Sequence, residues 1–372
     1  MNADAGAIAA AYRAAAAWPL PGPITRIEPL PGGHINDSFV LTCAAGEDEE
    51  RFILQRLNDR VFPRPRDVVE NIRRVTGHIR AALQREGVAE VERRVLTLLP
   101  TRDGGACVRG ASGDIWRLMR YIEDAWAPLA VTEPRQAEQG GRAFGAFQRL
   151  LADYDGPRLA ETIPDFHNTP MRFEALDRVV SQDPCRRVAQ ARDEIAFVRD
   201  RRALAGVLLD LQRRGHIPER IVHNDAKISN VLLDRRRDEW LCVVDLDTVM
   251  PGLSLFDFGD MVRSMTSPSD EDETDLSRVI LRPELFAALA RGYLAEAAAF
   301  LTPAEREHLV TAGKLITLEQ AVRFLTDYLA GDRYYKTTRP GQNLDRCRTQ
   351  IRLIESIETQ EAALQEVAAG LP

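Results

Sequence analysis

Three oxygen-bearing side chains occur at the spacing that a phosphoryl-transfer site requires. Asp225 follows a short apolar strand, and Asn230 comes five residues after it. A second apolar strand, 231–233, leads through an arginine-rich turn into a return strand, 241–244, which is followed by Asp245. Two antiparallel strands joined by a tight polar turn would bring the three side chains to the same end of the hairpin. The sequence therefore predicts one site.

Phosphoryl transfer requires mainly the positioning of groups and the neutralisation of charge. Asp225 is predicted to accept the proton of the acceptor hydroxyl, and Lys227 to contact the phosphoryl group during transfer. Asn230 and Asp245 are predicted to hold Mg2+, because this ion prefers hard oxygen ligands and takes few protein carboxylates. His223 is predicted to organise the loop by hydrogen bonding to the backbone near Asp245. The alternative, an Asx-rich hairpin with solvated carboxylates, is disfavoured by the apolar strands on both sides.

A second acidic segment, Asp257-Phe-Gly259, reads like the magnesium-binding triplet of protein kinases. It lies 27 positions after Asn230 (257 − 230) and follows a Pro-Gly pair, whereas Asp245 lies 15 positions after Asn230 (245 − 230) at a strand end. We therefore assign the metal to Asp245. Asp257 and Asp260 are predicted to brace the loop or to cap the helix that follows them.

Three segments share their pattern with a known family: 223–230 (HNDAKISN), 244–252 (VDLDTVMPG) and 255–260 (LFDFGD). They resemble the aminoglycoside phosphotransferase and choline kinase superfamily, and the match is closest to the bacterial N-acetylhexosamine 1-kinases. Further stretches that agree with this subgroup are 33–36, 52–55, 143–148, 323–332 and 348–350. The resemblance extends from about residue 24 to about residue 360. It implies a two-lobed kinase fold, ATP with Mg2+, and phosphorylation of the anomeric hydroxyl of N-acetylglucosamine or N-acetylgalactosamine.

The expected fold is α+β and protein-kinase-like. A small nucleotide-binding lobe with an antiparallel sheet would occupy residues 1–119, a hinge 120–126, and a larger, mainly helical catalytic and acceptor-binding lobe 127–372. Composition agrees, since 372 residues with 45% hydrophobic side chains can bury two cores. The net charge of −7 disfavours a nucleic-acid surface. Five scattered cysteines without a Cys-x-x-Cys pair favour a reducing cytoplasm. No apolar run has membrane-spanning length, and no obligate protein partner is evident.

The nucleotide is expected against three strands, 24–30, 37–43 and 51–57, whose alternation predicts an antiparallel meander. The glycine turn between the first two strands would bring backbone amides close to a phosphate, although such a pair can also form a plain hairpin turn. The residues predicted to bind the nucleotide here are Gly33, Asn36 and Ser38. At the end of a further predicted strand, 115–122, the backbone groups around Arg120, Tyr121 and Ile122 would meet the adenine edge, unless this is simply a core strand with an exposed end.

The third strand lacks the lysine with which kinases hold the α- and β-phosphates. Gln55 or Arg56 would replace it, and only one of them can face the cleft because strand side chains alternate. The family pattern places Gln55 at the lysine position. The helix 67–85 would pack behind this strand, with Glu70 or Asn71 facing it.

The acceptor pocket is expected where the helical lobe meets the catalytic loop. Its candidate residues come from the glycine turn, from one helix and from the segment just past that helix: His34, Arg323, Tyr328, Asp332 and Tyr334. The alternative for Arg323 is a helix-face ion pair with Asp327, four residues later. His167 would cap a turn or touch substrate, and 270–273 would be a solvated acidic loop.

The sequence leaves other functions open. Another hydroxylated metabolite or an aminoglycoside could be the acceptor, because the run 261–266 departs from the pattern of the hexosamine kinases. The absence of a dense acidic cluster in the C-terminal helices disfavours a cationic antibiotic. A nucleotide-binding pseudokinase is the alternative from another class, and retention of Asp225 disfavours it.

Overall fold

The computed structural model describes residues 2–30 and 35–371, so the predictions for Gly33 and His34 concern residues outside the described part. The chain forms two compact units. The first unit comprises the residues up to Trp126 together with 153–164 and 233–250, and the second unit comprises 127–152, 165–232 and 251–372. The change of unit at Trp126 coincides with the end of the predicted hinge, but two later segments also join the first unit.

The first unit contains a five-stranded antiparallel sheet with the order β1-β2-β3-β5-β4. Its strands are β1 (Ile24–Pro29), β2 (Asp37–Ala45), β3 (Asp48–Arg56), β4 (Val108–Arg109) and β5 (Ile115–Arg120). The predicted meander and the predicted strand at 115–122 are confirmed. The same unit holds α1 (Asn2–Ala15), α2 (Pro65–Arg85) and α3 (Val91–Arg94).

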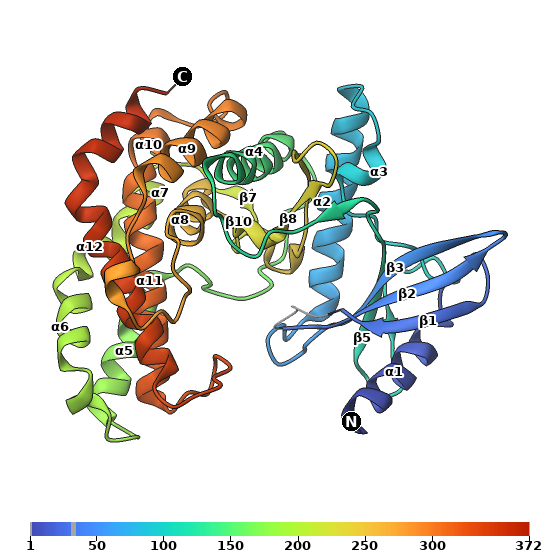
Figure 1. The fold of residues 1–372 in the computed structure, drawn as a ribbon, viewed down its shortest axis with the longest axis horizontal. Coiled ribbons are helices and arrows are strands. Elements are labelled where there is room, and N and C mark those ends of the chain that lie inside the picture. Colours follow the sequence, from blue (N-terminus) through green and yellow to red (C-terminus); the bar gives the residue numbers. More distant parts are fainter. Residues whose placement is uncertain (1, 31–34, 372) are drawn as a thin grey trace. The chain divides into compact units, whose positions relative to one another are not determined.

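One face of this sheet is apolar because alternate residues of its strands are large hydrophobic side chains. Phe39, Leu54 and Leu118 pack with Trp18 and with the alanines of α1 in one buried cluster. Figure 1 shows α1 lying against the strands that carry these residues. Trp18 Nε1 also donates to Leu99 O at 2.9 Å, which fixes the end of α1 to the sheet. The opposite face is therefore the one left for polar contacts.

Two cross-strand rows occupy that opposite face. Ser38, Gln55 and Arg117 are directly opposite one another on β2, β3 and β5. Val40, Ile53 and Met119 form the next row in the same register. A polar row thus lies beside an apolar row on one side of the sheet.

Helix α2 begins at Pro65 and carries Asp67 in its first turn and Arg85 in its last, which suits the helix dipole. Val69 of α2 packs with Leu57 and Ile115. The hairpin of β8 (Val231–Asp234) and β9 (Trp240–Val243) forms a three-stranded sheet with β6 (Ala125–Trp126). This confirms the predicted hairpin.

The second unit is mainly helical. Its helices are α4 (Pro134–Leu150), α5 (Thr169–Gln182), α6 (Arg192–Asp200), α7 (Val207–Arg213), α8 (Ser254–Met265), α9 (Pro283–Ala297), α10 (Pro303–Glu307), α11 (Leu309–Ala330) and α12 (Gln342–Ala369). A buried cluster joins α5, α6, α11 and α12 around Phe173, Val198, Phe324 and Ile354, and Figure 1 shows α11 running beside α12. Strand β7 (Arg220–Val222) pairs with β10 (Met250–Gly252).

Helices α4 and α9 approach so closely that their contact requires glycine. A Cβ atom on Gly292 would lie 2.1 Å from Glu138 O, and one on Gly141 would lie 2.3 Å from Leu289 O. Both contacts are to backbone, which cannot yield as a side chain does. Gly141 of α4 and Gly292 of α9 therefore allow the close packing of the two helices.

Two helical stretches of the second unit are interrupted. Residues 192–213 contain α6, then a 3-10 segment at Arg202–Gly206, and then α7. The helical stretch over 303–331 is interrupted at His308, which separates α10 from α11. Its Nδ1 lies 2.8 Å from Ala304 O. This side chain competes for a helical carbonyl and allows α10 to end before α11 starts. No helix in the described ranges has the length and apolar character needed to span a membrane.

Candidate active site

The loop that carries Asp225, Lys227 and Asn230 lies in the second unit between β7 and β8. Lys227 Nζ is 2.9 Å from Asp225 Oδ2, and Asn230 Nδ2 donates to the same oxygen at 3.0 Å and to Asp225 O at 2.8 Å. Burial raises the pKa of Asp225, but the charges of Lys227 and His223 and these hydrogen bonds outweigh burial and lower it. Asp225 is therefore a carboxylate at neutral pH. The amide NH2 group of Asn230 is engaged, so its carbonyl oxygen is the atom suited to a cation.

Asp257 braces this loop from α8. Its carboxylate is fully buried and accepts the N–H groups of His223 and Asn224 at 2.9 and 2.7 Å. Gln148 of α4 donates to it at 2.7 Å, and the hydroxyl of Tyr293 donates to Gln148 Oε1 at 2.7 Å. Burial raises the pKa of Asp257, against the opposing effects of His223 and these donors. The predicted bracing role is confirmed, but Asp257 lies inside the first turn of α8 instead of ahead of the helix.

His223 organises its own loop. Its Nδ1 accepts the N–H of Asp225 at 3.2 Å, and its ring packs edge-on against Phe144 and Phe147 of α4. The neighbouring Asn224 has a positive φ of 65°, a conformation that non-glycine residues adopt at a cost. The contacts of His223 and Asp257 maintain this strained loop.

Asp245 lies in the first unit, two residues after the end of β9, also with a positive φ of 60°. It is followed by the 3-10 turn Leu246–Thr248, whose Asp247 is 3% exposed. Asp247 Oδ2 accepts from Asn36 Nδ2 at 2.5 Å, and its Oδ1 lies 2.5 Å from Arg117 Nη2. These contacts fasten the turn beside Asp245 to residues that lead into β2 and lie on β5.

The donor chemistry of Asn230 and Asp245 suits Mg2+. Both residues offer oxygen, and Mg2+ keeps several waters and needs only one or two protein carboxylates. Among the described residues, no group of three or more His, Cys, Asp or Glu side chains could hold a metal.

The polar row on the sheet contains the predicted nucleotide residues Ser38 and Gln55. Gln55 Nε2 donates to Ser38 Oγ at 2.8 Å, and Gln55 Oε1 accepts from Arg117 Nη2 and Nε at 2.7 and 3.0 Å. Arg56 lies on the other face, paired with Asp37 and with its guanidinium carbon 5.8 Å from the centre of the Trp116 ring. Sequence reasoning missed Arg117, although a single arginine inside the apolar run Ile-Trp-Arg-Leu-Met was a visible signal.

The residues expected to face β3 from α2 behave differently from each other. Glu70 pairs with Arg73 and Arg74 of its own helix. Asn71 is buried and donates to Ala160 O and Val249 O at 2.7 and 2.9 Å. Asn71 thus supports the segment that follows Asp247, and Glu70 forms ion pairs within α2.

The hinge candidates follow β5. The amide of Tyr121 donates to Arg51 O at 3.2 Å, and the Tyr121 ring lies 4.1 Å from the guanidinium of Arg51. The amide of Arg120 donates to Thr97 O at 2.9 Å. These two amides are engaged, so the predicted adenine contact of this segment concerns the Tyr121 carbonyl and the backbone groups of Ile122.

The acceptor candidates on and after α11 divide into two groups. Tyr328 is 5% exposed and donates its hydroxyl to Gln190 at 2.9 Å. Asp332 pairs with Arg187 at 2.5 Å and accepts from Asn343 at 2.9 Å. Both side chains stabilise the helical core, so we remove them from the acceptor set.

Arg323 and Tyr334 remain acceptor candidates, because Arg323 lies among aromatic rings and Tyr334 is exposed. The guanidinium carbon of Arg323 lies 5.2 Å from the ring centre of Phe166 and 5.9 and 5.7 Å from those of Tyr334 and Tyr335. Tyr334 is 60% exposed. The alternative of an ion pair with Asp327 is wrong, because that carboxylate instead accepts the backbone amides of 333–335 at 2.8 to 2.9 Å. Asp327 thereby positions both tyrosines beside Arg323.

Arginines and carboxylates alternate around Arg323 within the second unit, where Glu319 acts on both Arg172 and Arg323. Burial lowers the pKa of Arg172, and the neighbouring Arg323 lowers it further. Burial also lowers the pKa of Arg263, but the carboxylates of Asp260 and Glu271, and more weakly Asp225, raise it overall. Arg263 and Arg323 in turn repel each other. Asp225, the general-base candidate, thus interacts electrostatically with Arg263, which in turn interacts with Arg323.

His167 and the acidic loop are both engaged in the structure. His167 Nδ1 lies 2.8 Å from Glu319 Oε1, and Thr169 donates to the other Glu319 oxygen at 2.6 Å. Glu271 pairs with Arg263 at 3.2 Å, and Asp272 with Arg339 at 3.3 Å. Asp270 and Glu271 of the predicted solvated loop are exposed, and arginine ion pairs additionally hold Glu271 and Asp272.

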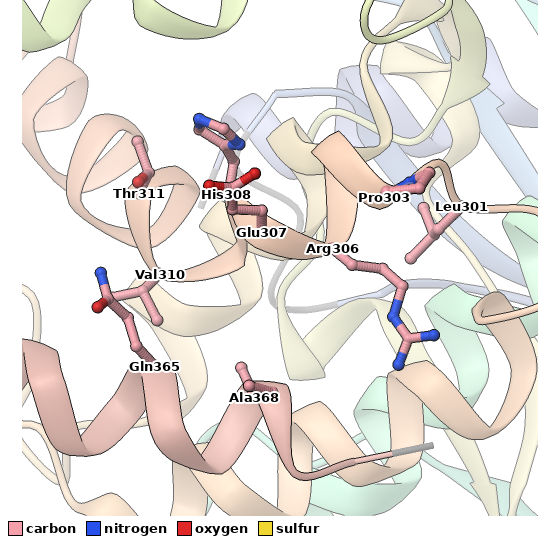
Figure 2. Close-up of a pocket in the computed structure, with 10 residues that line it drawn as sticks. Leu301, Pro303, Arg306, Glu307, His308, Val310, Thr311, Gln365 and Ala368 are labelled. Atoms are coloured by element: carbon pink, nitrogen blue, oxygen red, sulfur yellow. The ribbon is translucent and has the colours of Figure 1, made fainter.

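A separate hollow lies in the second unit where α10, the start of α11 and the end of α12 meet (Figure 2). It is lined by Leu301, Pro303, Arg306, Glu307, His308, Val310, Thr311, Gln365, Ala368 and Ala369. Figure 2 shows the Arg306 side chain beside the end of α12, where Nη2 donates to Leu371 O at 3.0 Å. None of these residues belongs to the catalytic loop or to the region around Arg323.

Comparison with known proteins agrees with this geometry. Residues 26–309, more than half of the chain, match the phosphotransferase enzyme family. Among solved structures, a microcompartment-associated aminopropanol kinase superposes with a TM-score of 0.60 at 15% identity, covering 96% of this chain and 98% of that one. A choline kinase from Cryptosporidium parvum Iowa II gives 0.55 at 12% identity, covering 91% and 90%. At these identities the likeness establishes the protein-kinase-like fold of such kinases.

Proposed function

Since the chain belongs to the phosphotransferase enzyme family, we propose that it is a small-molecule kinase that uses ATP and Mg2+ to phosphorylate the anomeric hydroxyl of an N-acetylhexosamine. The observation that carries the kinase proposal is Asp225, ionised, paired with Lys227 and held by a loop that Asp257 braces. Such a carboxylate suits a general base for a hydroxyl nucleophile. A pseudokinase would have no use for it.

In this proposal the chain's own groups do three things. Asp225 orients the acceptor hydroxyl and takes its proton at a carboxylate oxygen, while Lys227 moves from Asp225 to the phosphoryl group. Asn230 and Asp245 would hold Mg2+, which when bound neutralises charge on the phosphates. The apolar row Val40, Ile53 and Met119 suits the adenine ring and the polar row suits phosphates.

The aromatic side chains around Arg323 support a neutral acceptor. Arg172 and Arg323 have no ion pair with a carboxylate among the described residues, although the charge of Glu319 acts on both, and Arg323 is ringed by aromatic side chains. A choline, ethanolamine or aminoglycoside acceptor would bring a second positive charge close to these guanidinium groups, which is less favourable than a neutral acceptor. A neutral sugar offers hydroxyl oxygens and an N-acetyl carbonyl to Arg323 and an apolar ring face to Tyr334.

An amino-alcohol kinase is the second candidate, because the fold matches an aminopropanol kinase and a choline kinase. ADP release distinguishes the two proposals when measured with N-acetylglucosamine, N-acetylgalactosamine, choline, ethanolamine and kanamycin at equal concentration. We expect turnover with the N-acetylhexosamines and none above background with the amines. Preferential turnover with choline or ethanolamine would reject the sugar assignment and leave the kinase assignment in place.

A further inference from the structure

The feature that the proposed function leaves unexplained is the missing phosphate-binding lysine of β3. Strand alternation and register decide what replaces it. Gln55 lies between Ser38 and Arg117 across three adjacent strands, on the face opposite the α1 cluster. Arg56 lies on the face of that cluster. The only cationic side chain of this polar row is therefore on β5.

The guanidinium of Arg117 is fixed in place, but not all of its hydrogen-bond donors have acceptors. Its Nε and Nη2 atoms donate to Gln55 Oε1, and Nη2 also lies 2.5 Å from Asp247 Oδ1. Its Nη1 is buried and has no hydrogen-bond partner among the described residues. The side chain as a whole is 1% exposed. A buried N–H group without an acceptor is unfavourable, so the site is incomplete as it stands.

We propose that Arg117 binds a phosphate of the nucleotide through Nη1, taking the part that a β3 lysine plays in other kinases. This inference rests on the proposed function. A guanidinium presents a planar fork of donors that matches phosphate oxygens, and one of its edges remains for a ligand. Gln55 is then a positioning residue, because its carbonyl fixes the guanidinium and its amide is fixed by Ser38.

The negative charge of Asp247 balances the positive charge of Arg117. An unpaired buried guanidinium would be strongly unfavourable before the nucleotide binds, and the Asp247 carboxylate offsets that cost. Asp247 is two residues after the metal candidate Asp245. The competing explanation is that Arg117 and Asp247 form a purely structural tie, in which case removing Arg117 would weaken the fold without selectivity for phosphate.

The test is a binding measurement that needs no turnover. Isothermal titration with ATP, ADP, AMP and adenosine would be run on the wild type, Arg117→Met, Arg117→Lys and the matched control Arg56→Met. We expect Arg117→Met to lose at least about tenfold in affinity for ATP and ADP, with adenosine unchanged. Arg117→Lys should recover part of the loss, and Arg56→Met should match the wild type.

The outcomes separate this inference from the proposed function. A wild type that binds no ATP overturns both. A wild type that binds ATP, with Arg117→Met weakening ATP and adenosine equally or neither, overturns the role of Arg117 alone. If Arg117→Met does not fold, the double variant Arg117→Met/Asp247→Asn removes both buried charges together. The selective loss of phosphate affinity must then appear in that variant and in Arg117→Lys.

Discussion

Glu305 is the point at which the structure predicts a large, pH-dependent loss of stability. Its side chain is 1% exposed and accepts from Nε and Nη2 of Arg220, each at 2.9 Å. It also accepts from Ser254 at 2.5 Å and from the N–H of Thr302 at 2.7 Å, completing a capping box. Arg220 begins β7 and Ser254 begins α8, so one carboxylate joins the two elements that carry the catalytic loop and its brace.

Glu305→Gln keeps the shape and removes the charge, leaving Arg220, whose side chain is 16% exposed, without its counter-ion. Breaking a fully buried pair costs about 3–5 kcal/mol, and the partial exposure of Arg220 places the expected loss at about 2–3 kcal/mol. Burial raises the pKa of Glu305, but the hydrogen bonds and charge of Arg220 outweigh burial, so the pKa is lowered from 4.5. A carboxylate with a lowered folded-state pKa contributes stability above the unfolded value and loses it as pH falls through the folded value. The difference from wild type should therefore be full at pH 7 and shrink below pH 4.5.

Urea unfolding followed by circular dichroism at several pH values measures this difference. The matched control is Glu307→Gln on the same short helix, where the side chain is exposed and the expected change is within about 0.5 kcal/mol. A loss below about 1 kcal/mol at pH 7, or one that grows on acidification, would refute the reasoning.

Three further outcomes are expected. Asp257→Ala leaves the amides of His223 and Asn224 without their acceptor, so turnover should fall about a hundredfold through displacement of the base; unchanged kcat in steady-state assays would exclude the bracing role. Arg323→Met should raise KM for the acceptor at least about tenfold while KM for ATP stays constant, and an equal rise in both would remove Arg323 from the acceptor site. Burial raises the pKa of Cys43 to about 11 and of Cys242 to about 12; Ellman's reagent at pH 8 should therefore leave both thiols unmodified until the protein is denatured, and rapid labelling of either one in the native protein would contradict their burial.

The sequence predicted most of the elements that position the site. Strand alternation gave the meander of the first unit and placed Gln55 and Arg56 on opposite faces, as observed. Apolar strands around the polar loop gave the β8–β9 hairpin. Local pattern is sufficient for these features because period-two burial and polar turns are encoded within a few residues.

Features that depend on tertiary contacts could not be predicted from the sequence. Arg117 meets Gln55 only through the register of β3 and β5, which no local pattern specifies. Tyr328 and Tyr334 looked equivalent as acceptor candidates, yet one packs into the core and the other lies exposed because Asp327 captures the amides of the turn. The helix break at His308 depends instead on a side-chain conformation, because the His308 side chain itself binds the carbonyl of Ala304. The single site formed by Asp225, Asn230 and Asp245, and the lobe boundaries at 119 and 126, remain predictions.

The central claim is that Asp225 is the base of an ATP-dependent kinase, and one paired measurement tests it directly. ADP release and ATP affinity would be measured side by side for wild type and Asp225→Asn, each with an N-acetylhexosamine as acceptor. We predict at least about a hundredfold loss of turnover with ATP affinity within about threefold of wild type. Turnover that survives the substitution would contradict the account.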